Sequence, residues 1–219
     1  PYGDPDSGQL AKWKQAILDE MVDLREDGSL LLNMEYFGYA TALTMCRKGR
    51  FEKLFGIPAR KRESDLEKDY MNLALAIQQV AEEAVTRMAA TARQLTGCPR
   101  LVMAGGVALN CVANGKLVRA KTFDEVWIQP AAGDAGGALG AALAARHIHF
   151  DEERPPRKER DDMEGGYLGP AFGDRAVERV ACKYGAQYRT VRDERKLFRE
   201  VAGYLDQGKV VGWFQGRME

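Results

Sequence analysis

Two glycine-rich turns hold the residues whose types and spacing could do chemistry. Gly105 and Gly106 follow a short apolar run at 101–104, and a GDAGG sequence at 133–137 follows a second run at 125–129. A strand that leads into a glycine turn and then a helix directs free N–H groups and the positive end of the helix dipole at a ligand above the sheet, which suits an anion or a ribose-phosphate. Glycine serves there because a β-carbon would block close approach or forbid a positive φ. Taken alone, the glycine pair is more often a tight turn than a ligand site.

Asp134 lies in the second turn and has two interpretations. Its carboxylate could cap a helix by accepting from the N–H groups of Gly136 or Gly137, or it could point into a cleft and bind a metal or a ribose hydroxyl. The two turns lie within about one βαβ unit of each other, so we expect their loops at the same edge of a parallel pair of strands. Open α/β sheets bind ligands at that edge. Together the two turns predict a nucleotide site.

Other residues with chemical potential carry weaker signals. His147 and His149 could be metal ligands, but beside charged residues near the end of a helix a solvated pair is the favoured interpretation. The carboxylates of Glu82 and Glu83 are expected on the exposed face of a helix. The cysteines form no C-x-x-C pair, which argues against a zinc ribbon or a redox motif and favours reduced thiols in the cytoplasm. They are Cys46, Cys98, Cys111 and Cys182.

The elements that must position these residues follow from the apolar pattern. Apolar spacing of three and four predicts a first helix over 10–24 and a longer helix over 73–95 that ends at Gly97. A turn at Asp27-Gly28 and a strand over 29–36 come between them. Residues 47–69 are charged and read as a surface connection, in which Ser64 and Glu67 are spaced as a capping box. The stripe of the longer helix consists of Leu73, Ile77, Val80, Ala84, Met88 and Leu95.

The two turns then belong to two successive strand–turn–helix units. The strand at 101–104 precedes a helix that carries Val112 and Leu117, and the strand at 125–129 precedes a helix of small residues over 138–145. Such a Gly/Ala surface permits close packing against a sheet or a ligand. The fold class is therefore α/β.

A second domain is expected after a charged, proline-containing linker at 151–164. Beyond it the pattern predicts a helix over 174–184 capped by Gly185, a strand over 187–191, a helix over 197–205 capped by Gly208, and a strand over 210–214. This region resembles the opening of a small α/β domain.

The bulk properties exclude several classes of protein. The chain has 219 residues, 45% of them hydrophobic and 29% charged, with 32 basic and 32 acidic side chains. This balance is that of a globular domain, and zero net charge gives no electrostatic case for nucleic acid or an anionic membrane. The apolar runs are too short to span a bilayer. The polar N-terminus, which lacks Met, suggests a piece of a longer protein.

Three segments resemble the O-carbamoyltransferase family, whose members modify nodulation factors, cephamycins and aminoglycosides. They are AGGVALNCVANGKL at 104–117, IQPAAGDAGGALGAAL at 128–143 and VVGWFQGRME at 210–219, and Tyr167-Leu168-Gly169-Pro170 also matches. The resemblance implies that residues 1–150 are the C-terminal half of an actin/Hsp70-like (ribonuclease-H-like) carbamoyl-transfer domain. Residues 165–219 would begin a YrdC-like domain that forms carbamoyl-adenylate.

The resemblance also implies roles for individual residues. Asp134 matches the family's metal-binding aspartate, with Fe(II) as the expected ion and Mg²⁺ as an alternative, while Arg217 and Glu219 are assigned to carbamoyl phosphate or the adenylate. No catalytic residue is assigned. The nucleotide contacts are expected from Gly105, Gly106, Val107, Asn110, Gly136 and Gly137.

The implied reaction uses ATP and carbamoyl phosphate to carbamoylate a hydroxyl of a small molecule or an oligosaccharide. The acceptor is not specified by the sequence, and neither nucleic acid nor membrane is an expected partner. The family's paired metal-binding histidines are not matched by His147 and His149. We therefore expect the isolated chain to bind metal weakly and to be inactive. The alternatives are a small-molecule kinase and a non-catalytic ATP-binding scaffold of the same superfamily.

Overall fold

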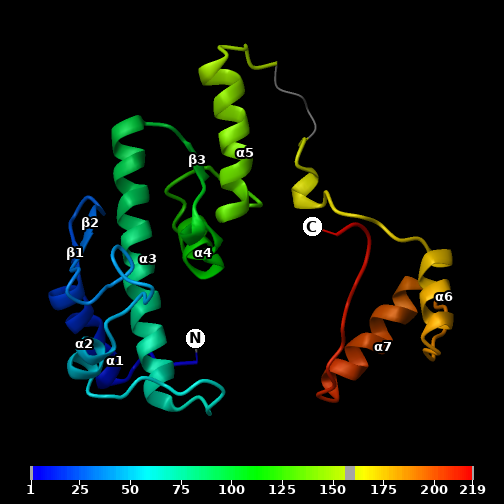
Figure 1. Ribbon diagram of the computed structural model, residues 1–219, viewed down its shortest axis with the longest axis horizontal. Helices are drawn as coiled ribbons and strands as arrows, with labels where there is room; N and C mark the ends of the chain where they lie inside the picture. Colours follow the sequence, from blue (N-terminus) through cyan, green and yellow to red (C-terminus); the bar gives the residue numbers. More distant parts are fainter. Residues whose placement is uncertain (1, 156–160, 219) are drawn as a thin grey trace. The chain divides into compact units, whose positions relative to one another are not determined.

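The computed structural model describes residues 2–155 and 161–218 and divides into two compact units, Pro1–His149 and Phe150–Glu219. The first unit is a mixed α/β structure, as the sequence predicts (Figure 1). Within the described residues, no helix is long and apolar enough to cross a membrane. The helices of the first unit are α1 (Gly8–Ala16), η1 (Ile17–Met21), α2 (Lys48–Phe55), α3 (Lys68–Thr96), η2 (Gly106–Leu109), α4 (Cys111–Ala120), α5 (Asp134–Ala144) and η3 (Ala145–His149).

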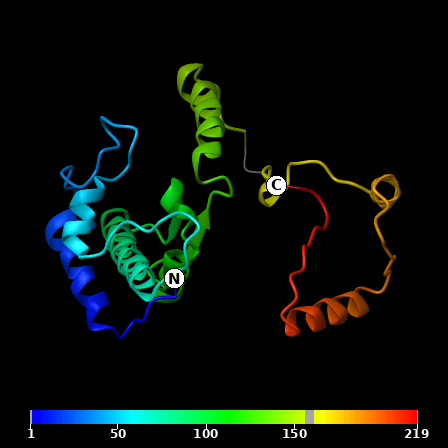
Figure 2. The ribbon, with the colours of Figure 1, turned by 60° about the horizontal axis from the view of Figure 1, so that its bottom comes forward.

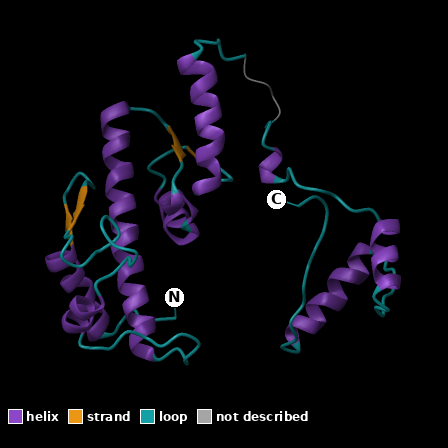
Figure 3. Ribbon diagram, in the orientation of Figure 1, coloured by secondary structure: helices purple, strands orange, loops and turns teal. Residues whose placement is uncertain are grey.

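The first unit has two small sheets, each of two short strands (Figure 3). One is the antiparallel hairpin of β1 (Val22–Leu24) and β2 (Leu30–Leu32). The other is the parallel pair of β3 (Arg100–Met103) and β4 (Glu125–Ile128). The crossover between β3 and β4 runs through α4, so the pair forms the βαβ unit that carries both glycine turns.

The N-terminal core lies between α1, α2 and α3. The helix α1 packs along α3 (Figures 1 and 2), and the buried Trp13 meets Phe55 of α2 edge to face at 6.0 Å between ring centroids. A buried amide, Asn72, ties the N-terminal segment to α3 by accepting from the Asp4 N–H at 2.8 Å and donating to Gln9 at 2.7 Å. These contacts fix the long helix α3, which also borders the second core.

The second core joins α3 to the βαβ unit. Its buried members are Ala89 of α3, Leu117 of α4 and Phe123, with Leu101 and Val126 of the two strands packed against them. This packing places the first glycine turn beside the middle of α3.

Several predictions for the N-terminal region are corrected. The first helix ends at Met21, and Leu24 belongs to β1, because the chain turns back at Gly28 with φ +82°. The expected strand at 29–36 is shorter, at Leu30–Leu32. The supposed surface connection contains α2, whose Phe55 is buried in the core.

The long helix is confirmed, but its start and part of its buried face differ from expectation. It begins at Lys68 after Glu67, and Ser64 bonds Lys61 O instead of forming a capping box. Gly97 ends the helix with φ +63° and donates to Arg93 O at 2.9 Å. Of the expected stripe, Val80 and Ala84 are buried, whereas Ile77, Met88 and Leu95 are exposed.

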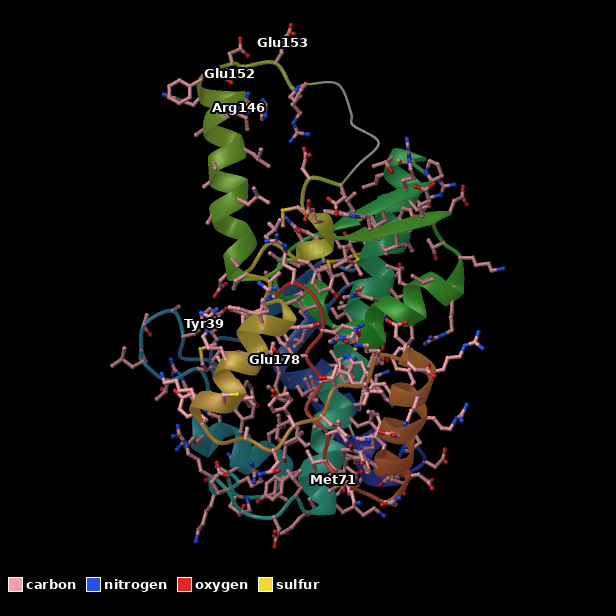
Figure 4. The ribbon with its side chains drawn as sticks, turned by 90° about the vertical axis from the view of Figure 1, so that its right-hand side faces the viewer. Tyr39, Met71, Arg146, Glu152, Glu153 and Glu178 are labelled. Atoms are coloured by element: carbon pink, nitrogen blue, oxygen red, sulfur yellow. The ribbon has the colours of Figure 1, made fainter. Side chains whose placement is uncertain are left out.

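The helix of small residues, α5, continues into the π-helix η3, and no residue of either is buried. Figure 4 shows Arg146 near the C-terminal end of these two consecutive helices, with Glu152 and Glu153 in the segment that follows.

The second unit contains η4 (Glu164–Gly166), α6 (Asp174–Lys183) and α7 (Glu194–Asp206). Both long helices were predicted, and Glu178 lies on α6 (Figure 4). The strands expected at 187–191 and 210–214 are absent, which is a correction. A strand needs a neighbour for its backbone groups, and these segments have no ladder partner within the described part of this unit. Of the predicted linker, residues 156–160 lie outside the described residues.

Candidate functional site

The two glycine turns meet at one edge of the parallel pair, as predicted. Met103 at the end of β3 pairs with Ile128 at the end of β4. Beyond them the Gln129 N–H donates to Met103 O at 3.0 Å, and the Gly105 N–H donates to Ala132 O at 2.7 Å. The second of these bonds joins the two turns directly, so any ligand held by one turn lies beside the other.

The two glycines of the first turn have different physical roles. Gly105 has φ +100° and ψ 159°, a conformation that is almost restricted to glycine. Gly106 has no such backbone constraint, and a β-carbon built on it meets no protein atom within 4 Å. A β-carbon at Gly106 would therefore leave the turn intact and enter the space next to it.

Gly136 and Gly137 in the second turn differ in a similar way. A β-carbon at Gly136 would lie 2.1 Å from Ala131 O, a backbone atom, so this glycine is required for the close approach of α5 to its own turn. A β-carbon at Gly137 would meet nothing within 4 Å. Gly106 and Gly137 thus face open space without the positive φ that constrains Gly105.

Asp134 is the first residue of α5, and Gly133 occupies the N-cap position. The N-cap interpretation of Asp134 is therefore wrong, because no side-chain bond caps this helix. The exposed carboxylate lies in the first turn of α5, where the helix dipole favours negative charge. The metal interpretation of Asp134 stays a prediction.

The described residues contain no group of three or more His, Cys, Asp or Glu side chains that could hold a metal ion. His147 and His149 belong to η3, which continues α5 at its C-terminal end, whereas Asp134 is the first residue of α5.

Asn110 is the N-cap of α4 and lies directly after the first turn. Its Oδ1 accepts from the Ala113 N–H at 3.1 Å, which satisfies one of the first N–H groups of the helix. The same side chain pairs with Gln78 of α3 through two reciprocal amide bonds, each 3.0 Å long. Within α4, Asn114 donates to Ala108 O at 2.7 Å, and this bond holds the buried Ala108 of η2 to α4. The turn is thus held by its own helix and by α3.

Glu82 was expected on an exposed helix face, and this expectation is wrong. It is only 6% exposed and accepts hydrogen bonds from Lys116 of α4 and from Gln78 at 2.9 Å. Burial raises the pKa of Glu82, but the bonds from Lys116 and Gln78 together outweigh burial and hold the pKa below its usual range. Glu82 and Gln78 are four residues apart on α3, a spacing that places them on one face. Only the fold shows that α4 covers this face.

Glu83 is also paired. Its carboxylate lies 2.9 Å from the Lys14 ammonium of α1 and also meets Arg87, and these partners hold the pKa of Glu83 below its usual range, the hydrogen bond from Lys14 contributing most. This cluster joins α1 to α3.

In the second unit, the segment around Arg217 lies against the segment around Gly169. The Arg217 guanidinium donates to Gly169 O at 2.7 Å, and the Gly169 N–H donates to Met218 O at 2.8 Å. The Met218 N–H donates to Pro170 O at 3.1 Å. Two segments nearly fifty residues apart, both singled out in the sequence, therefore touch. Glu219 lies outside the described residues.

Comparison with known proteins finds a family model that covers most of the first unit and relatives that match the whole chain. The family model described as "Carbamoyltransferase N-terminus" matches residues 2–143. An uncharacterized protein of Synechocystis sp. is 49% identical over 221 residues, covering 100% of this chain and 34% of that protein. Nodulation protein NolNO of Sinorhizobium fredii is 31% identical (100% of this chain, 29% of that protein), and nodulation protein NolO of Bradyrhizobium diazoefficiens is 29% identical (100% and 36%). The chain spans about a third of the length of these curated relatives.

Proposed function

The chain belongs to the carbamoyltransferase family, and from this premise we propose that it supplies the nucleotide-binding part of an ATP-dependent O-carbamoyltransferase. The observation that carries the proposal is the bond between Gly105 and Ala132, which brings two strand–glycine–helix turns to one edge of a parallel pair. That edge is where open α/β sheets bind nucleotides. We assign residues 1–150 to an actin/Hsp70-like carbamoyl-transfer domain and residues 165–219 to the start of a YrdC-like domain.

In the proposed reaction carbamoyl phosphate, ATP and water give carbamoyl-adenylate, pyrophosphate and phosphate. The hydroxyl oxygen of the acceptor then attacks the carbamoyl carbon, the bond from that carbon to the AMP phosphate oxygen breaks, and AMP leaves. The acceptor's proton passes to solvent or to a base. AMP is a good leaving group, so the protein's main tasks are to position the adenylate and to exclude water.

The first turn would hold the nucleotide. The open space over Gly106 would admit a phosphate or ribose close to the backbone. The helix α4 begins directly after this turn, and the first N–H groups of a helix favour an anion. Val107 would contact the nucleotide from η2, and Asn110 would fix the start of α4. Across the edge, the open space at Gly137 would take the adjoining part of the ligand.

The carboxylate of Asp134 has the donor chemistry for a metal, but the described residues do not complete a coordination set around it. We therefore derive no step through Fe(II) or Mg²⁺. Asp134 is proposed as one ligand, placed beside the nucleotide turns by the start of α5.

Arg217 is proposed as the anion contact of the second unit, for carbamoyl phosphate or the adenylate. Its bond to Gly169 O uses one of the five donors of a guanidinium, and this bond holds the side chain in place.

Calorimetric titration of ATP into the chain tests the nucleotide site. Gly106→Val should abolish ATP binding without lowering the unfolding temperature, because the added β-carbon meets no protein atom within 4 Å. Gly49→Val is the matched control, since Gly49 also faces open space and lies in α2, outside the site. Asp134→Ala should keep ATP binding. Equal ATP affinity in wild type and Gly106→Val would remove the first turn from the site.

A further inference from the structure

Four side chains form a continuous hydrogen-bonded network between α3 and α4. Lys116 of α4 donates to Glu82, Gln78 donates to Glu82 at 2.9 Å, and Gln78 and Asn110 exchange two bonds of 3.0 Å. The network holds α4 at two places, its N-cap and its second turn. Both are attached to a single turn of α3, between residues 78 and 82, so α4 is restrained against rotation and sliding.

The groups at the two ends of this network determine which atom donates and which accepts in each bond. Asn110 must present its oxygen to α4, because the Ala113 backbone N–H can only donate. An ionised carboxylate only accepts, so Gln78 must present its amide nitrogen to Glu82. The two hydrogens of that nitrogen then serve Glu82 and Asn110 Oδ1, and the Gln78 oxygen takes the Asn110 amide hydrogen. The amide of Gln78 has one orientation that satisfies every partner.

We propose that Gln78 is a positioning residue that holds Asn110 in its capping conformation and thereby fixes the 105–110 turn for the nucleotide. This proposal rests on the proposed nucleotide site. Gln78 lies on a different helix from the turn, and its side chain bonds to Glu82 and Asn110. Its effect on the ligand is transmitted through Asn110. Glu82 and Lys116 in turn fix the amide of Gln78.

The conformation of Asn110 matters because this residue is both the C-cap of η2 and the N-cap of α4. Asn110 has φ −74° and ψ 90°, outside the helical region, and its backbone N–H donates to Val107 O at 3.0 Å. A change in its side-chain position would therefore shift both η2 and the first N–H groups of α4. These are the groups that would face a phosphate.

The test replaces Gln78 with methionine, which keeps its length and removes its hydrogen bonds. The matched control is Gln79→Met, next along α3, where the side chain forms no bond to Asn110. Two quantities are measured on the 219-residue chain: hydrogen exchange of the backbone amides at 106–113 and the Kd for ATP. We expect Gln78→Met to speed exchange and to raise the Kd, each about tenfold, and Gln79→Met to change neither.

A double-mutant cycle separates positioning from a general structural effect. Asn110→Ser keeps a capping oxygen but has no amide for Gln78 to hold, so Gln78→Met should have no further effect on the Kd in that background. An equal loss in both backgrounds, or unchanged exchange in Gln78→Met, would overturn the proposal. If the wild-type chain binds no ATP while Gln78→Met still speeds exchange, the nucleotide function fails and the positioning role of Gln78 stands.

Discussion

Two adjacent glycines in α5, Gly136 and Gly137, should respond differently to substitution by alanine. In Gly136→Ala the new β-carbon would lie 2.1 Å from Ala131 O, against a shortest normal separation of 3.0 Å, so the two atoms must move apart by 0.9 Å. The obstacle is a backbone oxygen in the turn that also carries the Ala132–Gly105 bond, and it cannot swing away as a side chain would. Overpacking of this kind costs about 1–3 kcal/mol.

In Gly137→Ala the β-carbon meets nothing, and alanine is a better helix former than glycine by up to about 1 kcal/mol. For a chain of this size 1 kcal/mol corresponds to about 2–4 °C in Tm. We therefore expect Gly136→Ala to lower the Tm by about 2–12 °C and Gly137→Ala to leave it equal or slightly higher.

The assay is thermal unfolding followed by circular dichroism, with hydrogen exchange at the amides of 131–137 to locate the change. The Gly136→Ala variant should show faster exchange in this turn. Equal Tm values for the two variants, or a larger loss in Gly137→Ala, would refute the assignment of Gly136 as the close-contact glycine.

Two further predictions concern the residues that fasten the first turn. Because the pKa of Glu82 is lowered on folding, its stabilising contribution is present above its ordinary value of 4.5 and is lost as the pH falls through the folded-state pKa. Glu82→Gln should thus lower the free energy of unfolding by about 1 kcal/mol at pH 7. Chemical denaturation at a series of pH values should show the unfolding free energies of wild type and Glu82→Gln converging below pH 4.5. A difference between them that stays constant down to acid pH would contradict this. Asn114→Leu should cost about 1–3 kcal/mol, because the oxygen of the buried Ala108 loses its donor, and urea denaturation that shows no loss would contradict the role of this bond.

The parts of the fold that were predictable have local causes. Gly97 and Gly208 mark helix ends because a left-handed residue stops the helix, and both have positive φ. The two strand–turn–helix units were predictable because a short apolar run before glycines and an amphipathic helix is a local pattern. The parallel pairing of β3 with β4 then follows from the short crossover.

The errors come from contacts between distant residues. α2 was missed because Phe51, Leu54 and Phe55 sit among charged residues, and only the packing of Phe55 on Trp13 makes that helix favourable. Glu82 was placed in solvent because nothing in its neighbourhood along the chain shows that Lys116 comes to cover it. The strands at 187–191 and 210–214 were expected from β-forming residues, but a strand also needs a neighbour, and local sequence does not supply one.

The central claim is that the two turns form one nucleotide site, and an NMR titration with AMP tests it most directly. Addition of AMP to the isotopically labelled chain should shift the backbone amides of 105–110 and 133–137 together, along one binding curve, because the Gly105–Ala132 bond joins the two turns. In Gly106→Val both sets of shifts should disappear, while Gly49→Val should retain them. Shifts confined to one turn, or shifts that persist in Gly106→Val, would contradict the shared site.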